Sequence, residues 1–184
     1  MGTPTAYAFV DLETTGGSAQ HDRITEIAII RVEGESVTRY QSLINPQQHI
    51  SLFIESITGI SNAMVAAAPE FADVADEVWA WLQDCVFVAH NVRFDYGFLK
   101  QTFERVGKDF QPEQLCTVKL SRRLYPEHKH HGLDQLIDRH GLRMSQRHRA
   151  MADADAIYQF WQLVQREFDD ETLQAACLKV MNKP

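Results

Sequence analysis

The sequence predicts an α/β fold in which a mixed five-stranded sheet is flanked by helices. Short apolar runs typical of strands come first in the chain, and helical periodicity then alternates with further apolar runs. The resulting order, β-β-β-α-β-α-β-α, is typical of a mixed sheet with helices on both faces. Because 184 residues, 45% of them hydrophobic, can bury a substantial core, we expect one domain over 1–184 with its core at about 5–168.

The first three strands are predicted from their apolar content. The run from Ile24 to Val32 is nearly continuous, and Glu33-Gly34-Glu35 suits a turn, so the second and third strands are expected to form a hairpin. Asn45-Pro46 breaks this pattern, and a short helix is expected near 51–56. The three strands are expected over 5–13, 24–32 and 36–44.

Helices and strands are expected to alternate in the rest of the chain. Pro69 suits the first position of a helix that runs to Leu82. The short apolar run 86–89 is typical of a buried central strand, and Asn91 just after it is a good N-cap for the next helix, which ends before Gly107. The last elements are expected to be a strand at 115–116 and helices over 118–124, 133–140, 150–168 and 171–181.

Charge and cysteine content limit the class of protein. The net charge of −7 argues against broad, nonspecific coating of nucleic acid, although it does not exclude a nucleic-acid enzyme. Three widely separated cysteines provide neither a disulfide framework nor a zinc motif, so a reducing cytoplasm is expected. No apolar run has the length of a membrane span, and no membrane partner is expected. Basic residues crowd one stretch of the chain, namely Lys119, Arg122, Arg123, Lys129, Arg139, Arg143, Arg147 and Arg149.

Two acids at the end of the first predicted strand are candidate metal ligands. Asp11 and Glu13 lie two positions apart, so a strand points both side chains to the same face. Neighbouring carboxylates repel each other unless a cation lies between them. Hard oxygen ligands of this kind suit Mg²⁺ or Mn²⁺.

Two later segments carry matching groups, one after the predicted central strand and one at the start of the longest predicted helix. They are Asn91-x-x-Phe94-Asp95 and His148-x-Ala150-x-x-Asp153. Asp153 lies one turn before Ile157 of an apolar stripe, so its charge borders the core and needs a partner, which a metal ion provides. Four converging carboxylates and a histidine predict a two-metal phosphodiesterase site with a histidine base.

In order and type, these three motifs resemble those of the DnaQ-like, DEDDh branch of 3′–5′ exonucleases, the branch of the proofreading epsilon subunit of bacterial DNA polymerase III. The resemblance extends from about Tyr7 to Phe168. It implies a ribonuclease-H-like fold and the hydrolysis of single-stranded DNA from its 3′ end to nucleoside 5′-monophosphates. Replication proofreading, with a replicative DNA polymerase as partner, is the role it implies.

The resemblance also assigns roles to the five charged residues. Asp11, Glu13 and Asp153 are implied to hold the metal ion that activates water, and Asp11 bridges to a second ion that Asp95 supports through water. His148 is implied to accept the proton of the attacking water, which suits a histidine pKa of about 6.5. The expected cofactors are therefore two divalent ions, Mg²⁺ or Mn²⁺.

A substrate-binding set follows from the same resemblance. The backbone from Leu12 to Thr15 corresponds to the segment that holds the terminal 3′-hydroxyl, and Ile57-Thr58-Gly59-Ile60 to the wedge against the last base. Many relatives have His-Gly where this chain has Thr58-Gly59, so the stacking partner differs here. Phe94 suits base stacking and core packing equally. The full set is Leu12, Thr14, Thr15, Ile57, Thr58, Asn91, Phe94 and His148.

Two alternatives to a DNA exonuclease are open. One is an exonuclease that trims the 3′ ends of RNA or short oligonucleotides, because no residue pattern shows a contact to the 2′-hydroxyl. Histidine at position 148 argues against the oligoribonuclease-like branch, which has tyrosine in that role. The other is a non-catalytic subunit that binds nucleic acid or a polymerase, which does not need all five charged residues. A free-standing enzyme, an excised domain and part of a fusion all fit the sequence.

Several polar features have simpler interpretations. Glu26, on a predicted strand among apolar residues, is interpreted as a support for the fold or for the metal ligands. The tract from His128 to His131 is interpreted as a solvated loop rather than a metal site. For Arg147 and Arg149, a phosphate contact and a solvated loop are equally favoured.

Overall fold

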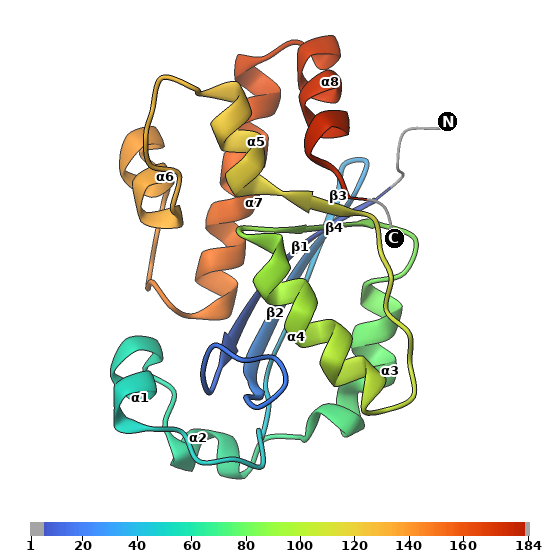
Figure 1. Cartoon of the computed structure of the whole chain (residues 1–184), viewed down its shortest axis with the longest axis vertical. Helices are drawn as coiled ribbons and strands as arrows, with labels where there is room; N and C mark the ends of the chain where they lie inside the picture. The colour runs from blue at the N-terminus through green and yellow to red at the C-terminus, as the bar shows by residue number, and fades with distance from the viewer. Residues whose placement is uncertain (1–5, 183–184) are drawn as a thin grey trace.

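A computed structural model describes residues 6–182 of the chain. Thr5, where the first strand was expected to begin, and both ends of the expected domain 1–184 lie outside the described residues. The strands are β1 (Tyr7–Thr14), β2 (Ile24–Glu33), β3 (Ser36–Leu43), β4 (Val86–Ala89) and β5 (Gln114–Cys116). The helices are α1 (Leu52–Thr58), α2 (Asn62–Ala66), α3 (Phe71–Trp81), α4 (Val92–Glu104), α5 (Thr117–Leu124), α6 (Leu133–His140), α7 (Ala150–Glu167) and α8 (Asp170–Val180) (Figure 1).

The strands form one mixed sheet in the order β3-β2-β1-β4-β5, which confirms the predicted fold class. β1 pairs antiparallel with β2 and parallel with β4. The expected hairpin joins β2 to β3, and Gly34 at its turn has a φ of +58°, a conformation that glycine adopts without steric cost. Because β1, β4 and β5 are parallel, their carboxyl ends lie at the same edge of the sheet.

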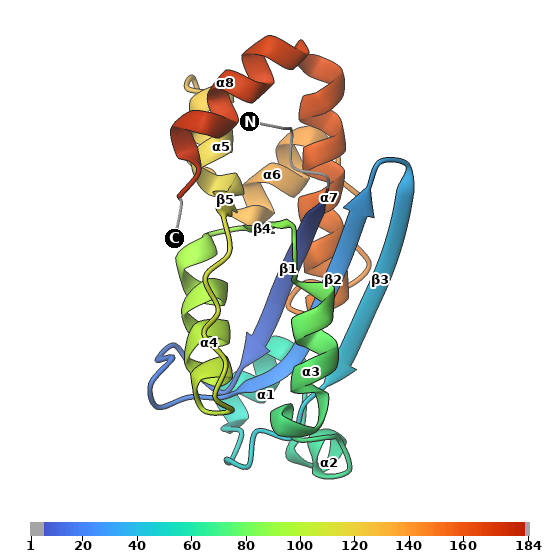
Figure 2. The same ribbon diagram turned by 90° about the vertical axis from the view of Figure 1, so that its right-hand side faces the viewer.

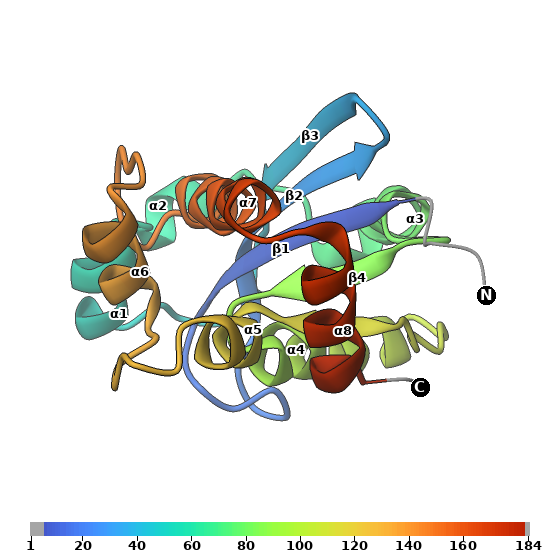
Figure 3. The ribbon, with the colours of Figure 1, turned by 90° about the horizontal axis from the view of Figure 1, so that it is seen from above.

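Alternation along β1 divides the core into two layers. Ala8, Val10 and Leu12 pack in the cluster that α3 and α4 cover, whereas Phe9 packs in the cluster that α5, α6, α7 and α8 cover. Figures 2 and 3 show α7 on the opposite side of the sheet from α3 and α4. Since successive side chains alternate, Asp11 and Glu13 point to the side of α7.

α1 and α2 lie beyond the sheet, near the N-terminal end of α7 in Figure 1. They surround a small core of their own, formed by Ile50, Ile60 and Val65. The Ser51 side chain caps α1 by accepting a hydrogen bond from the Ile54 amide, so the helix starts as predicted but extends to Thr58. α2 has only five residues, too few for helical periodicity to predict it.

Two predicted helix starts differ in detail. Pro69 is not the first residue of α3, because its carbonyl accepts the Asn45 amide and the extended backbone continues to the N-cap, Glu70. Asn91 does occupy the N-cap position of α4, but it has a left-handed φ of 66° and its side chain makes no capping hydrogen bond. The predicted N-cap position of Asn91 is therefore confirmed, but its side chain does not supply the capping hydrogen bond.

Within residues 6–182, no helix combines the length and the hydropathy needed to cross a lipid bilayer.

The contact of α7 with the sheet is expected to contribute strongly to stability. Phe160 is fully buried in α7, so Phe160→Ala should lower the free energy of unfolding by about 3–5 kcal/mol through lost burial and a residual cavity. Denaturant unfolding followed by circular dichroism measures this loss. Gln165→Ala, an exposed change on the same helix, is the control and should alter stability by less than about 0.5 kcal/mol. Equal stability of the two variants would contradict the packing.

Candidate active site

Asp11 lies near the carboxyl end of β1, where the parallel strands of the sheet end. Its side chain is half-buried, and one of its oxygens, Oδ2, is fully enclosed without a hydrogen-bond partner. Burial raises the pKa of Asp11 well above its usual range, and repulsion from Asp95, Asp153 and Glu13 adds to this shift. An enclosed carboxylate oxygen with no donor is a ready ligand for a cation.

Glu13 lies two residues farther along β1 and is 8% exposed. Burial, with repulsion from Asp153 and then Glu26, raises the pKa of Glu13 to about 8. Glu26 is its direct cross-strand partner on β2, and the β1–β2 register shifts immediately after this pair. The bulge marks the end of regular pairing at the site.

Asp95 joins the first turn of α4 to β1. It is 3% exposed, and its Oδ1 accepts a hydrogen bond from the backbone amide of Leu12 at 3.1 Å. Burial raises the pKa of Asp95 to about 8 even though this hydrogen bond favours the charged form. Since Leu12 lies between Asp11 and Glu13, the contact holds all three acids at one place.

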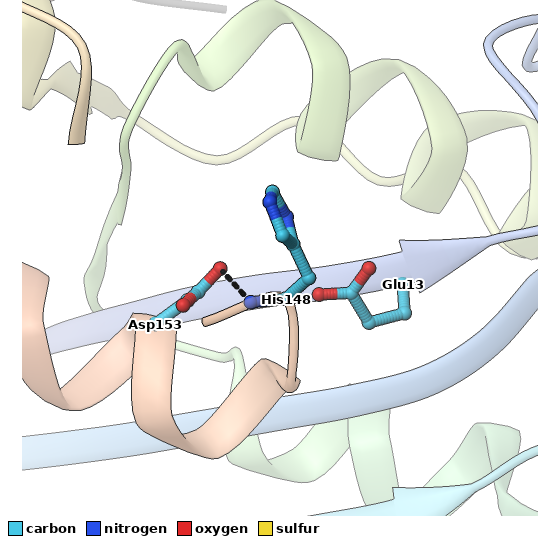
Figure 4. Close-up of side chains that lie close together, drawn as sticks. All are labelled: Glu13, His148 and Asp153. Carbon is cyan, nitrogen blue, oxygen red and sulfur yellow. Dashed lines mark hydrogen bonds between the residues drawn. The ribbon is translucent and has the colours of Figure 1, made fainter. Parts of the chain in front are cut away.

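The third motif is arranged by the loop that leads into α7. His148 has a left-handed φ of 60°, and its backbone amide donates to Oδ2 of Asp153 at 3.3 Å. Figure 4 shows this hydrogen bond and the Glu13 side chain beside it. Asp153 is 3% exposed, burial raises its pKa, and its Oδ1 is enclosed without a partner.

Glu13, His148 and Asp153 form a cluster that could hold a metal ion. Each offers one ligand atom, and these atoms all lie within 4.8 Å of one another. Enclosed, unpartnered oxygens of Asp11 and Asp153 add to this donor set. Oxygen-rich sets with a histidine fit Mg²⁺ or Mn²⁺, and bound cations would relieve the repulsion that raises the pKa values. The five predicted residues thus come together from β1, α4 and the start of α7.

Two arginines beside His148 make ion pairs that the sequence did not predict. Arg147 bridges two elements, pairing with Asp153 and, through Nε at 2.5 Å, with Asp134 of α6. Arg149 donates two hydrogen bonds to the Glu26 carboxylate, from Nε at 3.1 Å and from Nη2 at 2.7 Å. The Ala150 amide donates to the same carboxylate at 2.8 Å. Glu26 therefore anchors the N-terminus of α7 to the sheet beside Glu13, as its interpretation as a support requires.

The segment from Leu12 to Thr15 is already engaged in the fold. The Leu12 amide is held by Asp95, and the Thr15 amide donates to the Arg23 carbonyl at 2.9 Å. The Thr14 hydroxyl donates to the Gly16 carbonyl at 2.6 Å, and the Thr15 hydroxyl donates to Gln48 at 2.5 Å. These contacts order the loop after β1, and the substrate contacts of these residues stay predictions.

The segment expected to form the base wedge, residues 57–60, contains both buried and exposed residues. Thr58 is buried and its hydroxyl is satisfied, because it donates to the Ile54 carbonyl at 3.0 Å and accepts the Ile60 amide at 3.1 Å. Ile57 is 38% exposed, whereas Thr58 and Ile60 of this segment are buried. Phe94 is half-buried with its ring centroid 4.9 Å from that of Phe98, so it packs against the core and stays partly exposed.

Two histidines that the sequence did not single out for the site connect its edge to α5. Nδ1 of His90 lies 2.8 Å from the Thr117 hydroxyl, and its Nε2 donates to the His131 carbonyl at 2.8 Å. Burial lowers the pKa of His90 to about 4, so it is neutral near pH 7. His131 is buried and pairs with Ser121 at 2.7 Å, which shows that the expected solvated loop ends before this residue.

Comparisons with known proteins find similar exonucleases and polymerases. The model of the exonuclease family RNase_T matches residues 8–161, which confirms the resemblance inferred from the motifs. The PolC-type DNA polymerase III of Oceanobacillus iheyensis is 39% identical over 168 residues, 90% of this chain and 12% of the polymerase. The PolC-type enzyme of Staphylococcus aureus is 38% identical over 165 residues, 87% of this chain and 11% of the polymerase. The chain thus spans about an eighth of the length of these curated relatives.

Solved structures show the same fold. Exonuclease X in complex with 5′ overhanging duplex DNA superposes with a TM-score of 0.70 and 26% identity, covering 93% of this chain and 99% of that one. The zinc-bound complex of Escherichia coli ExoI with single-stranded DNA gives a TM-score of 0.82 at 23% identity, covering 94% of this chain and 42% of that one. The expected ribonuclease-H-like architecture is confirmed by these matches.

Metal affinity is expected to rise with pH. Glu13 and Asp95 each have a pKa of about 8 without metal, so below pH 8 a divalent ion must displace protons that it need not displace above pH 8. The apparent dissociation constant for Mn²⁺ should therefore increase about tenfold or more from pH 8 to pH 6, and it should level off above pH 8. Calorimetric titration in buffers of different ionisation enthalpy measures both the affinity and the released protons. Affinity that does not change with pH would refute the shifted pKa values.

Proposed function

The chain belongs to the RNase_T exonuclease family, and we propose that it is a metal-dependent 3′–5′ exonuclease acting on single-stranded DNA ends. Its products are nucleoside 5′-monophosphates. The observation that carries the proposal is the convergence of Glu13, His148 and Asp153 beside the enclosed, unpartnered oxygen of Asp11. Such a donor set suits cations that act on a phosphodiester.

The acids have distinct parts in this proposal. Asp11, Glu13 and Asp153 would hold two divalent ions, Mg²⁺ or Mn²⁺, and Asp95 would complete the set from α4. When bound, the ions polarise the attacking water and offset the negative charge of the scissile phosphate. Asp95 also positions the backbone between the other two β1 acids through its contact with the Leu12 amide.

His148 is proposed as the general base. Its imidazole accepts a proton as the water oxygen bonds to phosphorus, while the bond from phosphorus to the 3′ oxygen of the preceding nucleotide breaks. That oxygen takes a proton from solvent and becomes the new 3′-hydroxyl end of the strand. The hydrogen bond of its backbone amide to Asp153 and its left-handed backbone hold the ring at the carboxylates. In the DNA-bound state, Ile57 and Phe94 are the residues proposed to contact the terminal bases.

DNA is favoured over RNA as the substrate, and proofreading is the proposed role. The support is the identity of 39% to a PolC-type DNA polymerase III and the likeness to exonuclease X bound to DNA. A replicative DNA polymerase is accordingly the proposed protein partner. The proposal concerns this chain alone, since it matches only about 12% of the polymerase.

A labelled-substrate assay tests the function directly. The protein is incubated with 5′-labelled single-stranded DNA and with RNA of matched sequence, each with Mg²⁺, Mn²⁺ or EDTA. We expect a metal-dependent ladder that shortens from the 3′ end, faster on DNA. Faster shortening of RNA would indicate an RNA-trimming exonuclease instead. Binding without cleavage under every condition would indicate a non-catalytic subunit.

Removal of the Asp11 carboxylate distinguishes an effect on the reaction from an effect on folding. Asp11→Ala should lower the rate of DNA hydrolysis by at least about a thousandfold, because the site would lose one of the carboxylates that would hold the metal ions. The metal-free variant should melt no lower than the wild type, since burial penalises the Asp11 charge. Asp155→Ala, on the exposed side of α7 and paired only with surface groups, is the control and should keep near-normal activity. Retained activity in Asp11→Ala would exclude the two-metal assignment.

A further inference from the structure

α5 carries three cations on the face that points away from the core. Lys119, Arg122 and Arg123 are exposed, whereas Leu120 and Ser121 are buried. Their spacing of three and four residues places them along one side of the helix. Within residues 6–182, none of these three makes an ion pair, although Arg147 and Arg149 of the same basic stretch are both paired. The uneven distribution of basic residues along the sequence thus becomes a local, uncompensated positive surface.

A groove runs between this face of α5 and helix α8. Its volume is about 930 Å³, and Lys179 of α8 contributes a fourth cation to its lining. Leu124, Ala176 and Val180 supply apolar walls, and Glu171 is the one acid among the described lining residues. Lys179 is likewise exposed and without an ion pair among the residues that the structure describes. A groove with a row of cations and apolar walls suits a flexible polyanion with apolar parts.

Helix α5, which forms one wall of the groove, begins near the catalytic site. α5 starts directly after β5, and its first residue, Thr117, contacts His90 at 2.8 Å. His90 follows the carboxyl end of β4 and precedes the segment with Asn91 and Asp95. From there α5 runs for about 12 Å toward the end of the molecule opposite α1, as Figure 1 shows. The cations therefore lead away from the site on the side opposite the proposed base wedge.

We propose that the α5–α8 groove binds the phosphate backbone of single-stranded nucleic acid upstream of the reacting 3′ end. This inference rests on the proposed function, since it names the path of that substrate. The cations pair with successive phosphates, and the apolar walls contact sugars or bases. In a chain with a net charge of −7, such a surface offsets the repulsion of a long polyanion. Short substrates that end before the groove do not use it.

The test compares long and short substrates in a charge-neutralised variant. Arg122→Gln combined with Arg123→Gln should raise the KM for a 5′-labelled strand of about 20 nucleotides about tenfold at low salt. The KM for a trinucleotide and kcat for both substrates should not change. Because each lost phosphate contact reduces the salt slope by about 0.7, the slope for the long strand should fall by about 1.4. Equal effects on both lengths, or no effect on either, would overturn the proposal.

A control variant distinguishes the groove from overall charge. Arg39→Gln combined with Lys108→Gln removes the same charge from β3 and from the segment after α4, where both side chains make surface ion pairs. It should leave the KM and the salt slope for the long strand unchanged. If the control variant changes the KM and the salt slope as much as the Arg122/Arg123 variant does, the proposal of a local site at the groove would be overturned.

Direct binding keeps this inference separate from the proposed function. Fluorescence anisotropy in EDTA measures binding of the labelled 20-mer by wild type and both variants without cleavage. Weaker DNA binding by the Arg122/Arg123 variant, with unchanged binding by the control variant, would support the groove. This holds even if the wild type cleaves nothing, because absence of cleavage would refute only the proposed nuclease activity. Unchanged DNA binding with reduced binding of polyglutamate would assign the groove to an acidic protein segment and overturn the proposal.

Discussion

The mutual repulsion of carboxylates in an enclosed place is the constraint around which this structure is built. Asp11, Glu13, Asp95 and Asp153 come from three different elements, and burial raises the pKa of each. A fold does not gather four acids in this way for its own stability, because each charge loses its hydration. The arrangement is stable only with protons, a neighbouring cation such as Arg147, or bound metal ions.

The remaining contacts of the site hold these acids in position. The Leu12 amide fixes Asp95, the His148 amide fixes Asp153, and Arg149 ties the start of α7 to Glu26 on β2. Each contact joins a side chain to backbone or to another element far away in sequence. The site is thus held by the junction of β1, β2, α4 and α7 rather than by any single loop.

The basic residues have two separate parts in the molecule. Arg147 and Arg149, next to His148, form ion pairs with Asp134, Asp153 and Glu26, so they balance local negative charge. Those on α5 are directed to solvent beside a groove. A single basic stretch of sequence is therefore divided between internal neutralisation and an outward surface. Arg147 and Arg149 precede α7 and face buried acids, whereas Lys119, Arg122 and Arg123 lie on the exposed side of α5.

The sequence by itself determined the fold class and nearly all strands and helices, and it predicted the four acids and the histidine that the structure brings together. These depend on local periodicity and on motifs such as Asp11-x-Glu13, which can be recognised in the linear sequence. Tertiary structure decided what the remaining residues do. Thr58 is buried and satisfied, Asn91 does not cap α4 with its side chain, and Arg147 and Arg149 find acids up to 123 residues away. Burial and pairing depend on which distant segments meet in space, and a linear pattern does not encode those neighbours.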